Sequence, residues 1–177
     1  GDEVPYNLRI LTLEEFLDYT QNRGDFKYII EIKNGGETGK EALDILYNTL
    51  IERDILDRVI FGTFNGEISE YASENYPDLI RSASIKEVVE FYIAALLGRK
   101  GYEPPVKVLQ VFYGKKYFKF GVNLATSRVI NYAHSHNMAI QYWTINDEDE
   151  IRYLLSIGAD GIMTDYVEKA FEIKKEF

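Results

Sequence analysis

The sequence predicts an α/β fold of short parallel strands, which suits part of a (β/α) barrel better than a wide open sheet. Short, β-rich apolar runs alternate along the 177 residues with longer segments of helical period. This alternation is typical of parallel strands joined by crossover helices. Six strands are expected, near residues 29, 60, 79, 109, 141 and 162. A closed barrel needs eight strands and typically about 250 residues, so the chain is either an open doubly wound sheet or part of a larger barrel.

The first half of the chain begins with a helix and then alternates strands with helices. A capping box formed by Thr12 and Glu15 predicts a helix that begins near residue 13. The next elements are a strand, a helix, a strand, a short helix and a minimal strand, over 28–33, about 39–53, 59–61, about 65–75 and 79–80.

The second half repeats the pattern. Ser84 and Glu87 form a second capping box, which opens a helix to about residue 97. Asp147 is placed to cap a later helix, and Gly158 is a natural residue just past its end. The remaining expected elements are strands at 106–112, 139–144 and 161–163 and helices at about 126–135 and 167–175.

Composition excludes several classes of protein. Twenty basic against 29 acidic residues give a net charge of −9, which argues against nucleic-acid binding through a broad basic surface. A phosphate ligand would therefore need local positive charge, from a divalent cation or from one or two lysines. The absence of cysteine excludes thiolate chemistry and cysteine-based zinc sites. No apolar run is long enough to span a membrane, and the lack of a signal-peptide pattern at the first residues favours a cytoplasmic location.

Active sites of barrels and open α/β sheets lie at the carboxyl ends of the parallel strands. The candidate residues are the polar side chains found there: Glu31, Lys33, Thr63, Asn65, Arg81, Ser82, Gln110, Trp143, Thr144, Asn146, Thr164 and Asp165.

Glu31 and Lys33 form the most informative pair. They alternate with Ile30 and Ile32, so both side chains lie on one side of the strand, roughly 6–7 Å apart along it. In a barrel that side is the lumen, where a buried charge needs a partner or a metal. The pair is interpreted either as a cation ligand beside a phosphate-binding lysine or as an ion pair on an exposed sheet face.

Other candidates have an ordinary structural interpretation beside the functional one. Trp143, the only tryptophan, could line a pocket, but a core position is the more common role for such a residue. Asp165 could orient a polar group, although a helix N-cap is the favoured interpretation. His134 and His136 are two residues apart, so on a helix they do not converge on one ion and are expected at the surface or at a helix end. The loop lysines 115, 116 and 119 are expected in a solvated loop, with an anionic head group or membrane as the less favoured contact.

Several motifs together resemble a known family. They are Ile30-Glu31-Ile32-Lys33, Thr63-Phe64-Asn65, Leu109-Gln110-Val111, Tyr142-Trp143-Thr144-Ile145-Asn146 and Gly158-Ala159-Asp160-Gly161-Ile162-Met163-Thr164-Asp165. In this order they are similar to the C-terminal two-thirds of glycerophosphodiester phosphodiesterases. The Gly-Ala-Asp-Gly-Ile segment occurs in many barrels, whereas the Glu-Ile-Lys strand combined with the Trp-Thr-x-Asn motif is specific.

This resemblance implies a (β/α)8 barrel of which the chain supplies strands three to eight. It also implies metal-dependent hydrolysis of glycerophosphodiesters to glycerol 3-phosphate and an alcohol, an activity of lipid and glycerol metabolism. Glu31 matches one of three carboxylates that hold Mg²⁺ or Ca²⁺, and Lys33 matches the lysine beside the phosphate. Phe64 and Trp143 match aromatic residues that line the substrate end of the barrel.

The family pattern is incomplete in this chain. The family's His-Arg-Gly, Glu-Asn-Thr, Glu-x-Asp and His-Asp elements are absent, and with them both acid/base histidines and two metal carboxylates. His134 and His136 match the helix before the Trp143 strand instead. We therefore expect residues 1–177 to be a single, N-terminally incomplete barrel domain that is inactive alone. Completion by an N-terminal segment is one expectation, and a homo-oligomer or non-catalytic assembly module that pairs the open barrel edges is the alternative.

Overall fold

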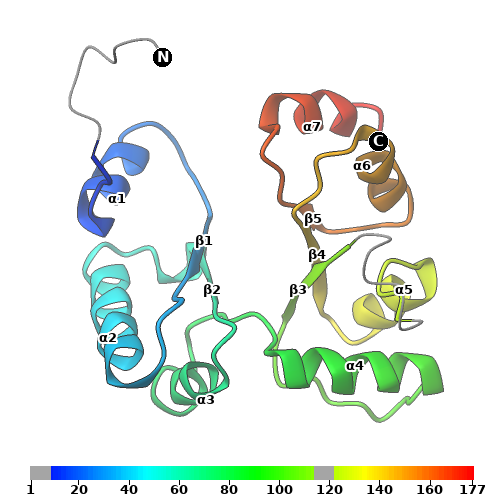
Figure 1. Cartoon of the computed structure of the whole chain (residues 1–177), viewed down its shortest axis with the longest axis horizontal. Coiled ribbons are helices and arrows are strands. Elements are labelled where there is room, and N and C mark those ends of the chain that lie inside the picture. Colours follow the sequence, from blue (N-terminus) through cyan, green and yellow to red (C-terminus); the bar gives the residue numbers. More distant parts are fainter. Residues whose placement is uncertain (1–8, 114–121) are drawn as a thin grey trace.

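The computed structural model describes residues 9–113 and 122–177. Helices lie on the outside of a group of strands, and the arrangement is open between the first helix and the last (Figure 1). The elements are, in order, α1 Leu13–Gln21, β1 Tyr28–Glu31, α2 Gly36–Glu52, η1 Leu56–Arg58, β2 Val59–Gly62, α3 Gly66–Asn75, α4 Ile85–Leu97, β3 Val108–Phe112, α5 Ser127–Ser135, β4 Ala139–Trp143, α6 Glu148–Ser156, β5 Gly161–Ile162 and α7 Val167–Lys174.

All strand pairings are parallel, as the alternation predicts. β1 pairs with β2, and β3 pairs with β4, which pairs with β5. Single bridges from Phe61 to Arg81 and from Ser82 to Val108 join these two groups. The strand order therefore follows the chain order, as in a barrel wall. This is part of a barrel, with β1 and β5 at its open edges in the described portion of the chain.

The minimal strand expected at 79–80 is displaced toward the C-terminus, although the carbonyl oxygen of Ile80 accepts from the Phe61 amide. The bridges lie at Arg81 and Ser82, where the amide of Ser82 donates to the carbonyl oxygen of Phe61 and that of Ala83 donates to Val108. Residues 76–83 connect α3 to the N-cap Ser84 of α4, and only Arg81 and Ser82 among them form bridges.

The helix termini form largely as the sequence predicts. Thr12 and Ser84 each form a capping box with the glutamate three residues on, and Asp147 caps α6. Gly158 follows α6 with φ +94°, a conformation that suits glycine. Asp165 is not an N-cap: α7 is preceded by Tyr166, and no side-chain capping bond is present there.

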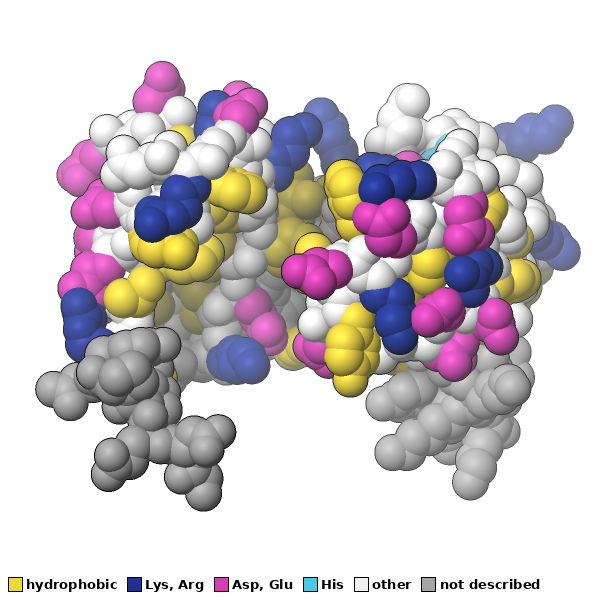
Figure 2. Space-filling model, turned by 90° about the horizontal axis from the view of Figure 1, so that it is seen from above, with side chains coloured by type: hydrophobic (Ala, Val, Ile, Leu, Met, Phe, Trp, Pro, Cys, Tyr) yellow, Lys and Arg dark blue, Asp and Glu magenta, His cyan; other side chains and the backbone are white. Residues whose placement is uncertain are grey.

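The core consists of two apolar clusters, one on each side of the 81–82 bridges. The first packs α1, α2 and α3 against β1 and β2, with Leu43 and Phe61 among its buried side chains. The second packs α4 to α7 against β3, β4 and β5, with Leu109 and Tyr142 among its buried side chains. Figure 2, seen from the side of the opening, shows a hollow between two groups of side chains, in which hydrophobic side chains are visible.

Candidate functional site

A cavity of about 350 Å³ lies at the carboxyl ends of the strands, and we call it the mouth. It brings together eight of the residues predicted for the site: Glu31, Lys33, Thr63, Phe64, Ser82, Gln110, Trp143 and Thr144. Ile29, Ala83 and Met163 complete its lining. Six parallel segments thus contribute to one cavity, as the position of active sites in such folds leads one to expect.

Glu31 and Lys33 lie on the same side of β1, as predicted. Ile32, between them, is buried under the helices, while the two charged residues are exposed toward the opening. Lys33 Nζ lies 4.0 Å from Glu31 Oε2, and the two side chains are 81% and 35% exposed. An exposed pair at this distance is weak, so both groups are free to bind other charges.

Trp143 lines the mouth and is only half-buried, so the interpretation as a core residue is wrong. Its ring makes an edge contact with Phe64, at 5.6 Å between centroids, and another with Phe112 at 6.2 Å. Phe64 is 60% exposed. Sequence reasoning missed Phe112, although its place at the end of β3 could have drawn attention to it. Phe64 and Trp143 form an apolar wall in the cavity that also holds the charged pair, and Phe112 contacts this wall through Trp143.

Polar side chains cross the lumen below this wall. Gln110 Nε2 donates to Gln141 Oε1 over 3.0 Å, which ties β3 to β4. A Cβ atom at Gly62 would lie 3.2 Å from Gln110 Oε1 and 3.5 Å from Ser82 Oγ. Glycine at position 62 therefore leaves room for the Gln110 side chain, a role that the sequence did not reveal.

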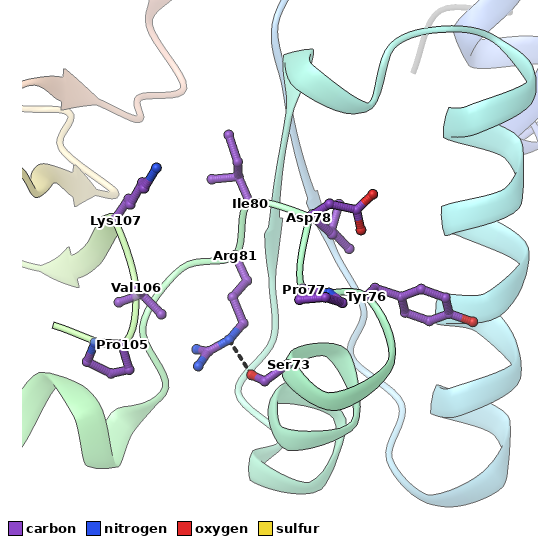
Figure 3. Close-up of a pocket in the computed structure, with 10 residues that line it drawn as sticks. Ser73, Tyr76, Pro77, Asp78, Ile80, Arg81, Pro105, Val106 and Lys107 are labelled. Carbon is purple, nitrogen blue, oxygen red and sulfur yellow. Dashed lines mark hydrogen bonds between the residues drawn. The ribbon is translucent and has the colours of Figure 1, made fainter.

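Arg81 points away from the mouth. Its guanidinium donates to both carboxylate oxygens of Glu87, at 2.7 and 2.8 Å, and to Ser73 Oγ at 2.7 Å. Figure 3 shows this contact with Ser73 beside a second cavity of about 510 Å³. Burial raises the pKa of Glu87, but hydrogen bonds from Arg81 and Ser84 outweigh it and leave that pKa below its usual value. Arg81 is thus a structural cation, and its place among the site candidates is a misassignment.

The remaining candidates hold the surrounding loops. Asn65 caps α3 by accepting from the amides of Glu67 and Ile68. Asn146 Oδ1 accepts from Thr164 Oγ1 and from the Asp165 amide, both at 3.0 Å, and its Nδ2 donates to Asp165 Oδ2 at 2.8 Å. Asp165 therefore orients a polar group, the interpretation that was not favoured. These bonds join the loop after β4, which contains Thr144, to the loop after β5.

Both histidines lie at the end of α5, away from the mouth, as predicted. His134 Nε2 lies 2.9 Å from Asp160 Oδ2, and His136 Nδ1 lies 2.9 Å from the carbonyl oxygen of Tyr132. Lysines 115, 116 and 119 fall outside the described residues.

The sequence profile of the glycerophosphoryl diester phosphodiesterase family matches residues 1–169, almost the whole chain. The chain belongs to this family.

Two relatives show the same relationship. A glycerophosphodiester phosphodiesterase of Bacillus altitudinis is 25% identical over 167 residues, covering 93% of this chain and 62% of its own length. The Bacillus subtilis protein YqiK is 24% identical and is covered over 66% of its length. The chain thus spans about two-thirds of these relatives.

Solved structures agree in fold. A glycerophosphodiester phosphodiesterase from Parabacteroides distasonis superposes with a TM-score of 0.70 at 18% identity, covering 93% of this chain and 63% of that one. An Oleispira antarctica phosphodiesterase, solved with the product sn-glycerol-3-phosphate, superposes with a TM-score of 0.62 at 16% identity, with coverage of 92% and 60%. The predicted family resemblance is confirmed, and so is the fold as part of a barrel.

The described residues provide only part of a divalent-cation site. Within residues 9–113 and 122–177, no group of three or more carboxylates or histidines could hold a metal ion. Glu31 is the one carboxylate among the residues that line the mouth. A hard cation such as Mg²⁺ or Ca²⁺ prefers several oxygen ligands, so Glu31 suits the role of one ligand among others. The described residues also contain no helix long and apolar enough to cross a membrane.

Proposed function

We propose that this chain forms the larger part of a barrel that hydrolyses glycerophosphodiesters to glycerol 3-phosphate and an alcohol. The observation that carries the proposal is the mouth, where a carboxylate, an ammonium group and an aromatic wall share one cavity at the carboxyl ends of the strands. The Oleispira antarctica relative was solved with sn-glycerol-3-phosphate, in which a phosphate is joined to glycerol. A ligand of this kind offers an anionic group to the ammonium and a carbon skeleton to the aromatic wall.

Each group of the mouth has a role in this proposal. The Lys33 ammonium, which is 81% exposed and only loosely paired, binds the phosphate oxygens. The rings of Phe64 and Trp143 pack against the carbon skeleton of the glycerol. Glu31 is one ligand of a Mg²⁺ or Ca²⁺ ion, which when bound offsets the negative charge of the phosphate. Hydrolysis adds water across one P–O bond. The hydroxyl group of the water joins the phosphorus, and the leaving alcohol takes up the other proton of the water.

The chain alone lacks groups that this chemistry needs. Its two histidines lie at the end of α5, so no imidazole of the chain serves as acid or base at the mouth. We therefore propose that the opening between α1 and α7 receives further strand–helix units that contribute these groups. In support, β1 and β5 have free edges in the described structure, and an apolar groove of about 450 Å³ runs beside β5 and α7. A non-catalytic role, in which the open edges pair with a partner chain, would use the same surfaces.

An extended protein tests this proposal. The N-terminal third of the Bacillus altitudinis relative is joined to this chain, and release of glycerol 3-phosphate from glycerophosphocholine is measured with Mg²⁺ or Ca²⁺. We expect hydrolysis by the extended protein and none by the chain alone. We also expect Glu31→Gln to abolish it, because an amide is a poor ligand for a hard cation. Glu37→Gln, a matched change on the surface of α2, should retain activity. A fully active Glu31→Gln protein would refute the metal assignment.

A further inference from the structure

The outward face of α4 is apolar along its whole length. Five large side chains, each 45–66% exposed, form this surface, which we call the α4 stripe: Ile85, Val89, Ile93, Leu96 and Leu97. Their spacing places them on one side of the helix, opposite the buried Phe91, Ala94 and Ala95. The helix has a complete capping box at its start and Gly98 with φ +61° at its end. The stripe is therefore an extra apolar face on a well-formed helix that already packs a core face.

The open side of the barrel does not explain the stripe. α4 lies on the far side of the molecule from the opening between α1 and α7 (Figure 1). Both neighbouring helices are present, because α4 contacts α5 directly and Glu87 of α4 shares Arg81 with Ser73 of α3. Additional strand–helix units inserted at the opening would leave the stripe exposed.

The other outer helices expose fewer apolar residues: α1 exposes Phe16 and Tyr19, and α7 exposes Val167 and Phe171, two large side chains one turn apart on each helix. α2, the longest helix, has the exposed residues Glu37, Glu41 and Asn48 around an exposed Ile45. Isolated exposed hydrophobic residues of this kind are normal on any protein. The exposed parts of the five stripe residues add up to roughly 500 Å², the size of the largest apolar patches on ordinary monomers, which are often functional.

We propose that the α4 stripe is the interface of a homodimer in which α4 of one copy packs against α4 of another. A twofold axis pairs a surface with itself, so complete burial of two stripes would cover about 1,000 Å², the lower limit for a specific interface. In an antiparallel arrangement, Val89 of one copy lies beside Ile93 of the other. Charges of both signs flank the stripe, namely Lys86, Glu90, Arg99 and Lys100. A membrane surface is the less suitable occupant, because the net charge of −9 opposes adsorption to anionic lipids.

Sedimentation velocity over a range of protein concentrations tests the dimer. Ile93→Lys places a charge at the centre of the stripe and should raise the dimer dissociation constant at least about tenfold. Ile45→Lys makes the same change at a similarly exposed isoleucine on α2 and should leave the constant unchanged. Circular dichroism checks that both variants are folded. A monomer at all concentrations, or equal effects of the two substitutions, would overturn the proposal.

Cross-linking separates the α4 stripe from the open edges. The chain contains no cysteine, so single cysteines report one surface at a time. With a short bismaleimide, Val89→Cys should yield covalent dimers, whereas Phe171→Cys on α7 and Ile45→Cys on α2 should not. Dimers formed only by Phe171→Cys would assign association to the open edges instead. If the Ile93→Lys substitution changed the flotation of the protein with phosphatidylcholine vesicles and left the mass found by sedimentation unchanged, that result would assign the stripe to a membrane.

Discussion

The Glu31–Lys33 pair illustrates how little two adjacent charges constrain each other at an open surface. Lys33 Nζ is 4.0 Å from Glu31 Oε2, and most of the lysine is in solvent. Water screens such a pair, so neither charge is committed to the other. The same two residues in a closed barrel would face a narrower, drier lumen, where their interactions with phosphate and a cation would be stronger.

Removal of the Lys33 charge should weaken ligand binding without affecting folding. We expect Lys33→Met to lower the affinity for sn-glycerol 3-phosphate about tenfold, because a charge-assisted contact with phosphate is lost. Isothermal titration calorimetry measures the change. Lys100→Met, at an exposed lysine distant from the mouth, is the matched control and should bind as the unmodified chain does. Equal affinities of the two variants would show that Lys33 does not contact the phosphate.

Arg81 should matter for stability and not for the ligand. Its side chain and that of Glu87 are only 13% and 14% exposed, so Arg81→Ala leaves a buried carboxylate unpaired. We expect a loss of about 2–4 kcal/mol in the free energy of unfolding, measured with urea at pH 7. Arg152→Ala, which breaks exposed ion pairs, should cost less. If the folded Arg81→Ala variant bound glycerol 3-phosphate more weakly than the unmodified chain, Arg81 would have to be counted among the ligand-binding residues.

The Arg81–Glu87 ion pair makes the free energy of unfolding depend on pH. The folded-state pKa of Glu87 lies below its usual value, so its contribution is fully present above the unfolded pKa, near 4.3. That contribution disappears as the pH falls through the folded pKa. Urea unfolding between pH 7 and pH 3 should therefore show a steeper loss of stability in the unmodified chain than in Arg81→Ala. Parallel curves would contradict this coupling.

At the scale of elements, local signals predicted the helices well. The capping boxes at Thr12 and Ser84 determine where α1 and α4 begin, because they satisfy amides that the helix itself cannot. The segment at 79–82 was harder, since so short a run has no alternation to indicate which side chain faces inward. The orientation of Arg81 depends on contacts with α3 and α4, which no local pattern contains.

The site shows the same division between local and tertiary information. The family motifs predicted that Glu31, Lys33, Phe64 and Trp143 share one region, and they line one cavity. Gly62 was missed because its role depends on the reach of Gln110 from another strand. Asp165 was misjudged because its partner, Asn146, is 19 residues away in the sequence and adjacent only in the fold.

Loss of Asn146 should loosen the loops after β4 and β5 together. Asn146→Ala removes three hydrogen bonds at an exposed position, so we expect a loss of about 1–2 kcal/mol in the free energy of unfolding. Near-ultraviolet circular dichroism should also change, because Trp143 lies just before this loop. Asn75→Ala, which removes one exposed bond at the end of α3, should leave the tryptophan signal intact. An unchanged Trp143 signal in Asn146→Ala would mean that the loop is positioned by other contacts.

At the scale of the whole molecule, the described residues form an open part of a barrel wall, and helices cover the outer side of its strands. Its core is divided into two clusters, and the mouth spans both, with Phe64 from one side in contact with Trp143 from the other. The free edges of β1 and β5 in the described structure and the hollow in Figure 2 are where we propose that further strands dock. The chain carries a net charge of −9, so under the proposed function phosphate binding would depend on Lys33 and on a bound cation.

The fluorescence of Trp143 provides the most direct test of the claim that the mouth binds glycerophosphodiester chemistry. Trp143 is the only tryptophan and lines the cavity, so its emission reports occupancy of the mouth. The chain is titrated with sn-glycerol 3-phosphate in the presence of Mg²⁺ or Ca²⁺, and with glycerol as the control. We predict a saturable change in emission with glycerol 3-phosphate and none with glycerol. An emission unchanged by glycerol 3-phosphate, with no heat of binding in calorimetry, would contradict the account.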